Sequence, residues 1–216
     1  MPTEQAFSQA FDEATEHSRE GRLQDAADAW ARAADLAPDR PDVHYNLGNA
    51  LKKLGRLDDA AQAYRRCVVL ESGLANAHYN LAGVLKEMGR LVDAADAYRG
   101  AIGADANDAE AHMNLGNTLD LLGDNEAAEQ SLRQSAALDP GSVVAHVNLA
   151  NVLLKAGSID EAEACCQRAL GIEPNLPRAH DCLGRIQLER GDLGAAAGHY
   201  QNAIDLDAGF AQAHAN

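Results

Sequence analysis

The sequence repeats itself every 34 residues, and this period restricts the fold more than any other feature. Six repeats follow one another without insertion or deletion: 7–40, 41–74, 75–108, 109–142, 143–176 and 177–210. The fifteenth residue is glycine and the twentieth is alanine in every repeat. A period of this length is typical of a solenoid built from stacked supersecondary units. We therefore expect residues 1–6 to form an N-terminal tail and residues 211–216 to be the truncated start of a seventh repeat.

Each repeat has the pattern of two helices. In the second repeat, His44, Leu47 and Leu51 recur three and four residues apart, which makes one helical stripe. Gly55 suits the left-handed residue that follows a helix end, and Asp58 then places a negative charge in the first turn of a second helix. A lone helix pair cannot bury its apolar stripe, so neighbouring pairs must stack. The predicted fold class is an all-α helical solenoid.

The charge balance excludes several classes of partner. Eighteen Lys and Arg residues against 33 Asp and Glu residues give a net charge of −15. A surface this acidic repels phosphate backbones and anionic lipid headgroups, so we expect neither nucleic acid nor a membrane as a partner. No apolar run is long enough to span a bilayer, and the first residues lack the pattern of a secretory signal. We expect a soluble, cytoplasmic protein.

The residues of the repeat match a known pattern. His44-Tyr45-Asn46-Leu47-Gly48-Asn49-Ala50-Leu51, followed by Gly55, Ala60 and Tyr64, resembles the tetratricopeptide repeat, and the resemblance covers 7–210. Ala77-His78-Tyr79-Asn80-Leu81 is most similar to the repeats of O-GlcNAc transferases and their bacterial relatives. The resemblance implies a right-handed superhelix whose first helices line a concave groove, and a protein or peptide ligand bound there in an extended form.

Histidine and cysteine recur, but their positions do not favour a metal site. Six of the eight histidines occupy the fourth position of a repeat: His44, His78, His112, His146, His180 and His214. Equivalent residues on stacked repeats lie about 10 Å apart, whereas ligands of one metal lie at about 2 Å from it. We expect these histidines to be structural. The cysteines replace apolar residues of other repeats and are expected to pack as small apolar side chains: Cys67, Cys165, Cys166 and Cys182.

No catalytic motif occurs in the sequence. It contains neither a phosphate-binding glycine loop nor a nucleophile elbow nor a zinc-protease motif. We therefore expect no catalytic residue, no metal and no cofactor, and the chain itself is not predicted to be an enzyme.

Asparagines recur on one side of the first helices. A residue two positions after each repeat histidine points about 200° away from it. Asparagines occupy this position and the one three residues later: Asn46, Asn80, Asn114 and Asn148, then Asn49, Asn117 and Asn151. Each amide can pair with both the N–H and the C=O of a passing peptide. These residues resemble the asparagine ladder of O-GlcNAc transferases, which implies peptide binding. The alternative is that they form hydrogen bonds between adjacent helices.

Other side chains are expected to join this site. Tyr45 and Tyr79 precede two of the asparagines, and Lys52, Lys86 and Lys155 lie near the ends of first helices. A lysine is also favoured at a helix C-terminus by the helix dipole alone. The clamp that holds chaperone C-terminal tails needs basic residues where this chain has Tyr45, Glu110 and Asn114. We therefore do not expect such tails as ligands.

The two ends of the solenoid differ. Glu13 replaces a leucine found in the other five repeats, so the first helix is expected to cap the N-terminal end. The other end lacks a polar capping helix, and we expect Ala203, Ile204, Leu206 and Phe210 to form an apolar surface that causes weak self-association.

Three functions remain open from the sequence. The first is a protein-interaction scaffold that binds an extended peptide on the asparagine ladder. The second is the substrate-recruiting region of a larger enzyme, an O-GlcNAc transferase-like glycosyltransferase or another transferase, whose catalytic domain follows Asn216. The third is an assembly scaffold that stacks end to end through its last repeat.

Overall fold

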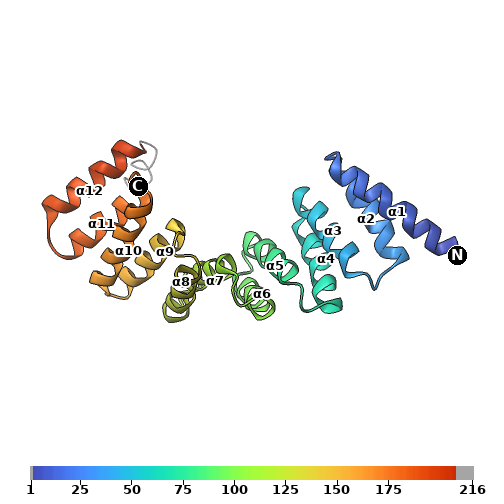
Figure 1. The fold of residues 1–216 in the computed structure, drawn as a ribbon, viewed down its shortest axis with the longest axis horizontal. Coiled ribbons are helices and arrows are strands. Elements are labelled where there is room, and N and C mark those ends of the chain that lie inside the picture. The colour runs from blue at the N-terminus through green and yellow to red at the C-terminus, as the bar shows by residue number, and fades with distance from the viewer. Residues whose placement is uncertain (1, 208–216) are drawn as a thin grey trace. The chain divides into compact units, whose positions relative to one another are not determined.

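The computed structural model describes residues 2–207, which form helices joined by short turns and contain no strand. Contacts divide the chain into an N-terminal unit, 1–107, and a C-terminal unit, 108–216. The helices of the N-terminal unit are α1 (Pro2–Arg19), α2 (Leu23–Leu36), α3 (Pro41–Lys53), α4 (Leu57–Leu70), α5 (Ala75–Glu87) and α6 (Leu91–Ala104) (Figure 1). Those of the C-terminal unit are α7 (Ala109–Leu122), α8 (Asn125–Leu138), α9 (Val143–Lys155), α10 (Ile159–Ile172), α11 (Pro177–Glu189) and α12 (Leu193–Leu206).

Within each unit the helices pack as stacked pairs. Every odd-numbered helix packs against the even-numbered helix that follows it. The second helix of one pair then packs against the first helix of the next, as α2 does with α3 and α8 with α9. The predicted all-α repeat fold is therefore confirmed.

The turn inside each pair depends on a glycine. Gly55 has a φ of 73°, in the left-handed region, and the equivalent glycine of every other repeat is also left-handed. The backbone N–H of Arg56 donates to the carbonyl of Leu51 at 3.0 Å, which closes the end of α3. A residue with a Cβ is strained in this conformation, so the invariant glycine is explained by the turn.

A second glycine makes room for a large side chain. Tyr64 of α4 is fully buried, and a Cβ placed on Gly48 of α3 would lie 2.7 Å from its ring. The same two positions of other repeats show the same fit: a Cβ placed on Gly116 would lie too close to Leu132, and one placed on Gly184 would lie too close to Tyr200. The close approach is therefore between a backbone and a side chain from the partner helix.

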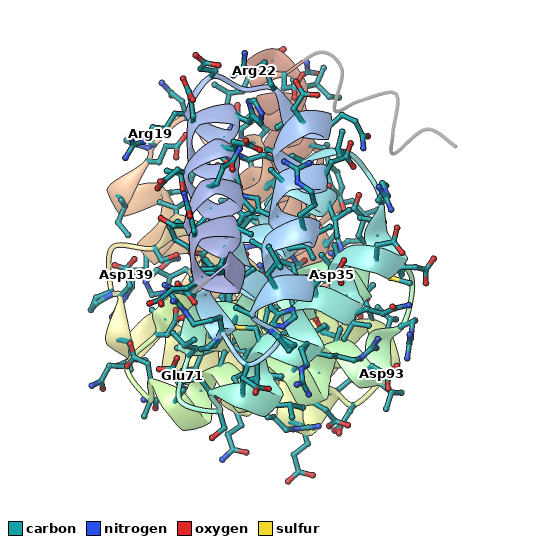
Figure 2. All side chains as sticks on the ribbon, turned by 90° about the vertical axis from the view of Figure 1, so that its right-hand side faces the viewer. Arg19, Arg22, Asp35, Glu71, Asp93 and Asp139 are labelled. Atoms are coloured by element: carbon teal, nitrogen blue, oxygen red, sulfur yellow. The ribbon has the colours of Figure 1, made fainter. Side chains whose placement is uncertain are left out.

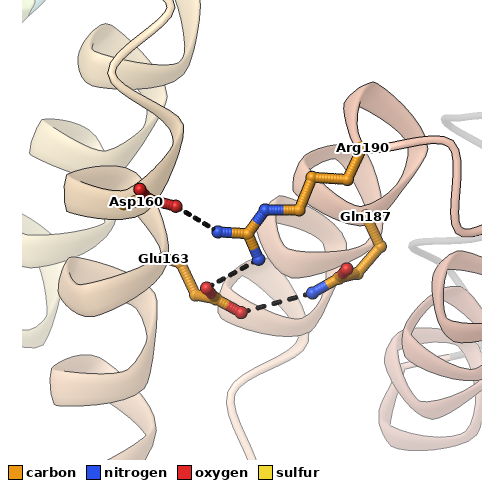
Figure 3. A network of polar contacts seen from close by, with 4 residues as sticks. All are labelled: Asp160, Glu163, Gln187 and Arg190. Carbon is orange, nitrogen blue, oxygen red and sulfur yellow. Dashed lines mark hydrogen bonds and ion pairs between the residues drawn. The ribbon is translucent and has the colours of Figure 1, made fainter.

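Polar contacts add to the packing between repeats. Figure 3 shows the guanidinium of Arg190, at the end of α11, between Asp160 and Glu163 of α10. Its Nη2 and Nη1 donate to these carboxylates at 2.6 and 2.7 Å, and Gln187 Nε2 donates to Glu163 at 3.2 Å. These groups are in contact with water, so each pair contributes at most about 1 kcal/mol. Other charged side chains, including Asp35, Glu71 and Asp93, are exposed to solvent (Figure 2).

The N-terminal end differs from the expected tail. Helix α1 begins at Pro2, so residues 2–6 continue the first helix rather than preceding it. Proline is tolerated in the first turn of a helix. Phe11 packs edge-on against Trp30 of α2, and the carboxylate of Glu13 accepts hydrogen bonds from Gln9 and Arg32. The first helix thus combines an apolar side with a solvated one, as expected of a cap.

The C-terminal end is less apolar than the sequence suggested. Ala203 is buried, so its expected exposure was wrong. Leu206 is 40% exposed, but the equivalent Leu36 and Ile172 are 39% and 45% exposed, so this position is open in other repeats too. Leu193 is 67% exposed, whereas the equivalent Leu57 and Leu91 are half-buried. Phe210, His214 and Asn216 lie outside the described residues.

The glycine that faces Tyr64 gives a stability prediction. Gly48→Ala should lower the free energy of unfolding by about 1 kcal/mol, because overpacking costs about 1–3 kcal/mol and the better helix propensity of alanine returns only about 0.5–1 kcal/mol. Gly103→Ala is the control, since Gly103 of α6 has no atom within 4 Å of an added Cβ, and it should stabilise the protein. Urea denaturation measures both. Equal stabilisation by the two substitutions would contradict the packing described above.

Candidate functional site

The predicted peptide-binding residues lie on the first helices of the repeats. We call them the N-terminal amide face (Tyr45, Asn46, Asn49, Lys52, Tyr79, Asn80 and Lys86) and the C-terminal amide face (Asn114, Asn117, Asn148, Asn151 and Lys155). All seven asparagines are half-buried. Their amides are therefore fixed by the surrounding helices but still reached by solvent.

The side-chain amides of Asn49, Asn80 and Asn151 have partners inside the protein. Tyr64 donates its hydroxyl to Asn49 Oδ1 at 2.7 Å. Asn80 Nδ2 donates to the Tyr45 hydroxyl at 3.1 Å and joins α5 to α3. Asn151 Oδ1 accepts from Arg185 at 2.8 Å, which joins α9 to α11. The last two bonds are those expected if the asparagines connect adjacent helices.

The side-chain amides of three other asparagines have no such partner among the described residues. Between residues 2 and 207, no hydrogen bond is formed by the side chains of Asn46, Asn117 and Asn148. A half-buried amide without a partner satisfies its acceptor and two donors only through water or a ligand. These three residues are the best candidates for contacts to a bound backbone.

A small cavity opens beside the first of them. It has a volume of about 150 Å³ and is lined by Ser18, Leu23, Ala26, Trp30, Asn46, Asn49, Ala50 and Lys53. Trp30 Nε1 donates to Ser18 Oγ at 3.0 Å, and that hydroxyl donates to the carbonyl of Ala14 at 2.7 Å. The cavity therefore has a rigid wall on α1 and α2 and two amides on α3.

A larger cavity of about 470 Å³ lies on the C-terminal unit. Its lining residues are Leu154, Lys155, Gly157, Ile159, Arg185, Leu188 and Glu189. Sequence reasoning did not single out Leu154 or Leu188. Both leucines occupy the repeat position that Lys52 and Lys86 occupy in other repeats, and this shared position was the signal that could have identified them.

The predicted lysines have different surroundings. Lys155 Nζ donates to both carboxylate oxygens of Asp120 on α7 at 2.7 Å. Lys52 and Lys86, by contrast, are half-buried on α3 and α5. Burial lowers the pKa of Lys86. Lys52 Nζ lies 3.9 Å from the place where a Cβ on Gly83 of α5 would lie.

Three of the repeat histidines connect their first helix to the turn before it. Nε2 of His44 lies 2.8 Å from the carbonyl oxygen of Pro38, and the corresponding distances are 3.1 Å for His78 and Ser72 and 3.0 Å for His146 and Pro140. A carbonyl oxygen only accepts, so the ring nitrogen donates. These contacts give the histidines the expected structural role.

Three of the cysteines are buried, as expected for small apolar side chains. Cys67, Cys166 and Cys182 are at most 1% exposed, and the four cysteines form no disulfide. Burial raises the pKa of Cys67 to about 11, so it stays a thiol. Cys166 and Cys182 share a hydrogen bond that raises the pKa of Cys166.

Comparison with known proteins decides the family. A family model described as tetratricopeptide repeat matches residues 11–75 and 79–143, more than half of the chain. Further models with the same description match 121–186 and 177–201. The chain belongs to the tetratricopeptide repeat family.

Solved structures of similar fold include other tetratricopeptide repeat proteins. The MamA protein is 23% identical with a TM-score of 0.74, and the match covers 79% of this chain and 93% of that one. YrrB, described as a tetratricopeptide repeat protein with an unusual peptide-binding site, is 22% identical with a TM-score of 0.74 over 84% of this chain and 94% of its own. PilF of Pseudomonas aeruginosa is 18% identical, with a TM-score of 0.71 over 97% and 95%. A search of curated proteins finds no match.

The described part of this tetratricopeptide repeat chain contains neither a group of metal-ligating side chains nor a candidate membrane-spanning helix. Among residues 2–207, no three His, Cys, Asp or Glu side chains are grouped to hold a metal ion. No helix in the same range has the length and apolar character needed to cross a membrane.

In the last tetratricopeptide repeat, the repeat histidine contacts a second histidine instead of a backbone carbonyl of the preceding turn. Nδ1 of His180 on α11 lies 3.5 Å from Nδ1 of His199 on α12. Burial, and then the proximity of His180, lowers the pKa of His199, while Glu163 acts in the opposite direction.

This pair makes stability depend on pH. In the unfolded chain the pKa of His199 returns to about 6.5. As the pH falls through that value towards the lower pKa of the folded state, the unfolded chain binds more protons, and the free energy of unfolding decreases. Urea denaturation at pH 7.5 and pH 5.5 should show a smaller loss of stability for His199→Gln than for the parent. An identical loss in both would contradict the proposed effect.

Proposed function

We propose that the protein is an interaction scaffold that binds extended segments of partner proteins on its amide faces. The observation that carries the proposal is the half-buried, internally unpaired amides of Asn46, Asn117 and Asn148, in a chain whose family provides protein-interaction scaffolds. YrrB, a protein of similar fold, is described as having a peptide-binding site. Asn46 lies on the N-terminal unit, and the other two lie on the C-terminal unit.

The amides suit a backbone ligand. One side-chain amide can accept from a peptide N–H while donating to a peptide C=O. Such contacts do not depend on the ligand's side chains, so they tolerate many sequences. Side-chain preference would come from the neighbouring surfaces, which include the leucine-lined cavity beside Arg185.

The affinity is limited by the small number of contacts. Each direct hydrogen bond contributes about 0.5–1.5 kcal/mol net, and ordering a flexible peptide subtracts part of that sum. A dissociation constant of 1 µM corresponds to about −8.2 kcal/mol. The amides alone should therefore give an affinity no better than about micromolar.

Replacing the unpaired amides tests the proposal. The triple variant Asn46→Ala, Asn117→Ala and Asn148→Ala should bind peptides at least about tenfold more weakly, because each loses contacts to the ligand backbone. Its melting temperature should not fall, since alanine favours helix more than asparagine does. An array of 12-residue peptides with randomised sequence identifies binders, and fluorescence anisotropy measures their affinity.

The internally bonded amides provide a matched control. Asn49→Ala and Asn80→Ala each remove a hydrogen bond to a tyrosine and should lower the free energy of unfolding by about 1 kcal/mol. If the triple variant binds as well as the parent, or unfolds as these controls do, the amides are structural and the proposal is wrong.

A second function, end-to-end assembly, is favoured by exposed side chains on α12. Tyr200 is half-buried although the equivalent Tyr64 and Tyr98 are buried. Leu193 and Ile204 are exposed, whereas the equivalent Leu57 and Val68 are half-buried. Apolar surface of this kind favours association.

Sedimentation at increasing protein concentration tests the assembly. The parent should show weak, concentration-dependent self-association that Leu193→Gln with Ile204→Gln reduces. Leu206→Gln is the control, because Leu206 is no more exposed than its equivalents, and it should have no effect. A monomer at every concentration would count against assembly, as would equal effects of the two substitutions.

A further inference from the structure

Two lysines of the N-terminal amide face lack the partners that other basic residues have. Arginines beside the second helices of this unit bind nearby carboxylates, as Arg56 does Asp59 and Arg99 does Asp96. Lys52 and Lys86 form no ion pair and no hydrogen bond with any residue in 2–207. The N-terminal amide face therefore carries positive charge that the protein does not itself neutralise.

The surroundings of Lys86 favour the binding of an anion to its ammonium group. Its side chain is half-buried, and burial is the only influence on its pKa, which it lowers. An ammonium group that loses water without gaining a partner is destabilised, and a bound carboxylate would offset that loss. The ammonium of Lys52 reaches α5 beside Gly83, one helical turn before Lys86. Both charges thus lie along one stretch of this face.

We propose that the N-terminal amide face binds an acidic segment, with Lys52 and Lys86 each binding one carboxylate. This inference rests on the proposed function, because the unpaired amide of Asn46 on the same face supplies contacts to the ligand backbone. The ligand's carboxylates are internal side chains, so a free C-terminus is not required.

The overall negative charge does not oppose this binding. At physiological ionic strength, interactions between exposed charges are screened beyond about 8 Å, and many of the carboxylates of this unit lie on the second helices, as Asp58, Asp59, Asp93 and Asp96 do. The C-terminal unit differs, because Asp120 holds the position of Lys52 and binds Lys155 there. Selection for acidic segments should therefore be confined to the N-terminal unit.

Two capped peptides of equal length test the inference. The first is four copies of Glu-Pro-Ala, and the second replaces every Glu by Gln. Fluorescence anisotropy at about 50 mM salt should show at least about fivefold tighter binding of the first peptide than of the second. Added salt should reduce the difference.

Lysine variants assign the effect to the two residues. Lys52→Gln with Lys86→Gln should abolish the preference for the Glu peptide over the Gln peptide. Arg99→Gln, the control from an ion-paired basic residue of α6 outside the amide face, should leave it unchanged. Loss of the preference in Arg99→Gln, or its persistence in the double variant, would overturn the assignment.

The outcomes separate this inference from the proposed function. If the Glu and Gln peptides bind equally well and both weaken in Asn46→Ala, the acidic preference is overturned and backbone binding is supported. If no peptide binds the parent, the inference is overturned, while the randomised array decides the proposed function independently.

Discussion

The fit between a small residue of the first helix and a large side chain of the second helix holds helix pairs together in several repeats. Tyr64 illustrates it, because its ring occupies the space above Gly48 and its hydroxyl donates to Asn49. This contact sets how close the two helices lie. It also fixes the rotation of α3, and therefore which of its side chains are left for solvent or a ligand. The amide faces depend on this packing.

Contacts between repeats use some of the same residues as the candidate binding site. His44, His78 and His146 join their first helices to the preceding turns. Asn80 bonds to Tyr45 one repeat earlier. The asparagine ladder is therefore of mixed composition: some amides connect helices, and others are left for a ligand. In physical terms, the bonded amides hold the unpaired ones in register, which lowers the entropy lost when a peptide binds.

The sequence predicted the fold well because the repeat is a local pattern. The period gave the helix pairs, and the left-handed glycine gave the turns, since both follow from residues close together in the chain. The site was predicted only in outline. Asn46 and Asn49 have the same residue type and the same helix, but Asn49 bonds to a tyrosine fifteen residues away and Asn46 does not. That difference depends on side-chain directions across helices, as do the burial of Ala203 and the pairing of Lys155 with Asp120.

The central claim is that the unpaired amides contact the ligand backbone while the bonded ones keep the helices in place. Nuclear magnetic resonance of the protein with ¹⁵N-labelled asparagine observes each side-chain amide separately. On addition of a peptide selected from the randomised array, the signals of Asn46, Asn117 or Asn148 should shift most, and those of Asn80 and Asn151 should shift less. If the peptide binds and none of the three unpaired amides shifts, they do not contact the ligand and the account is wrong.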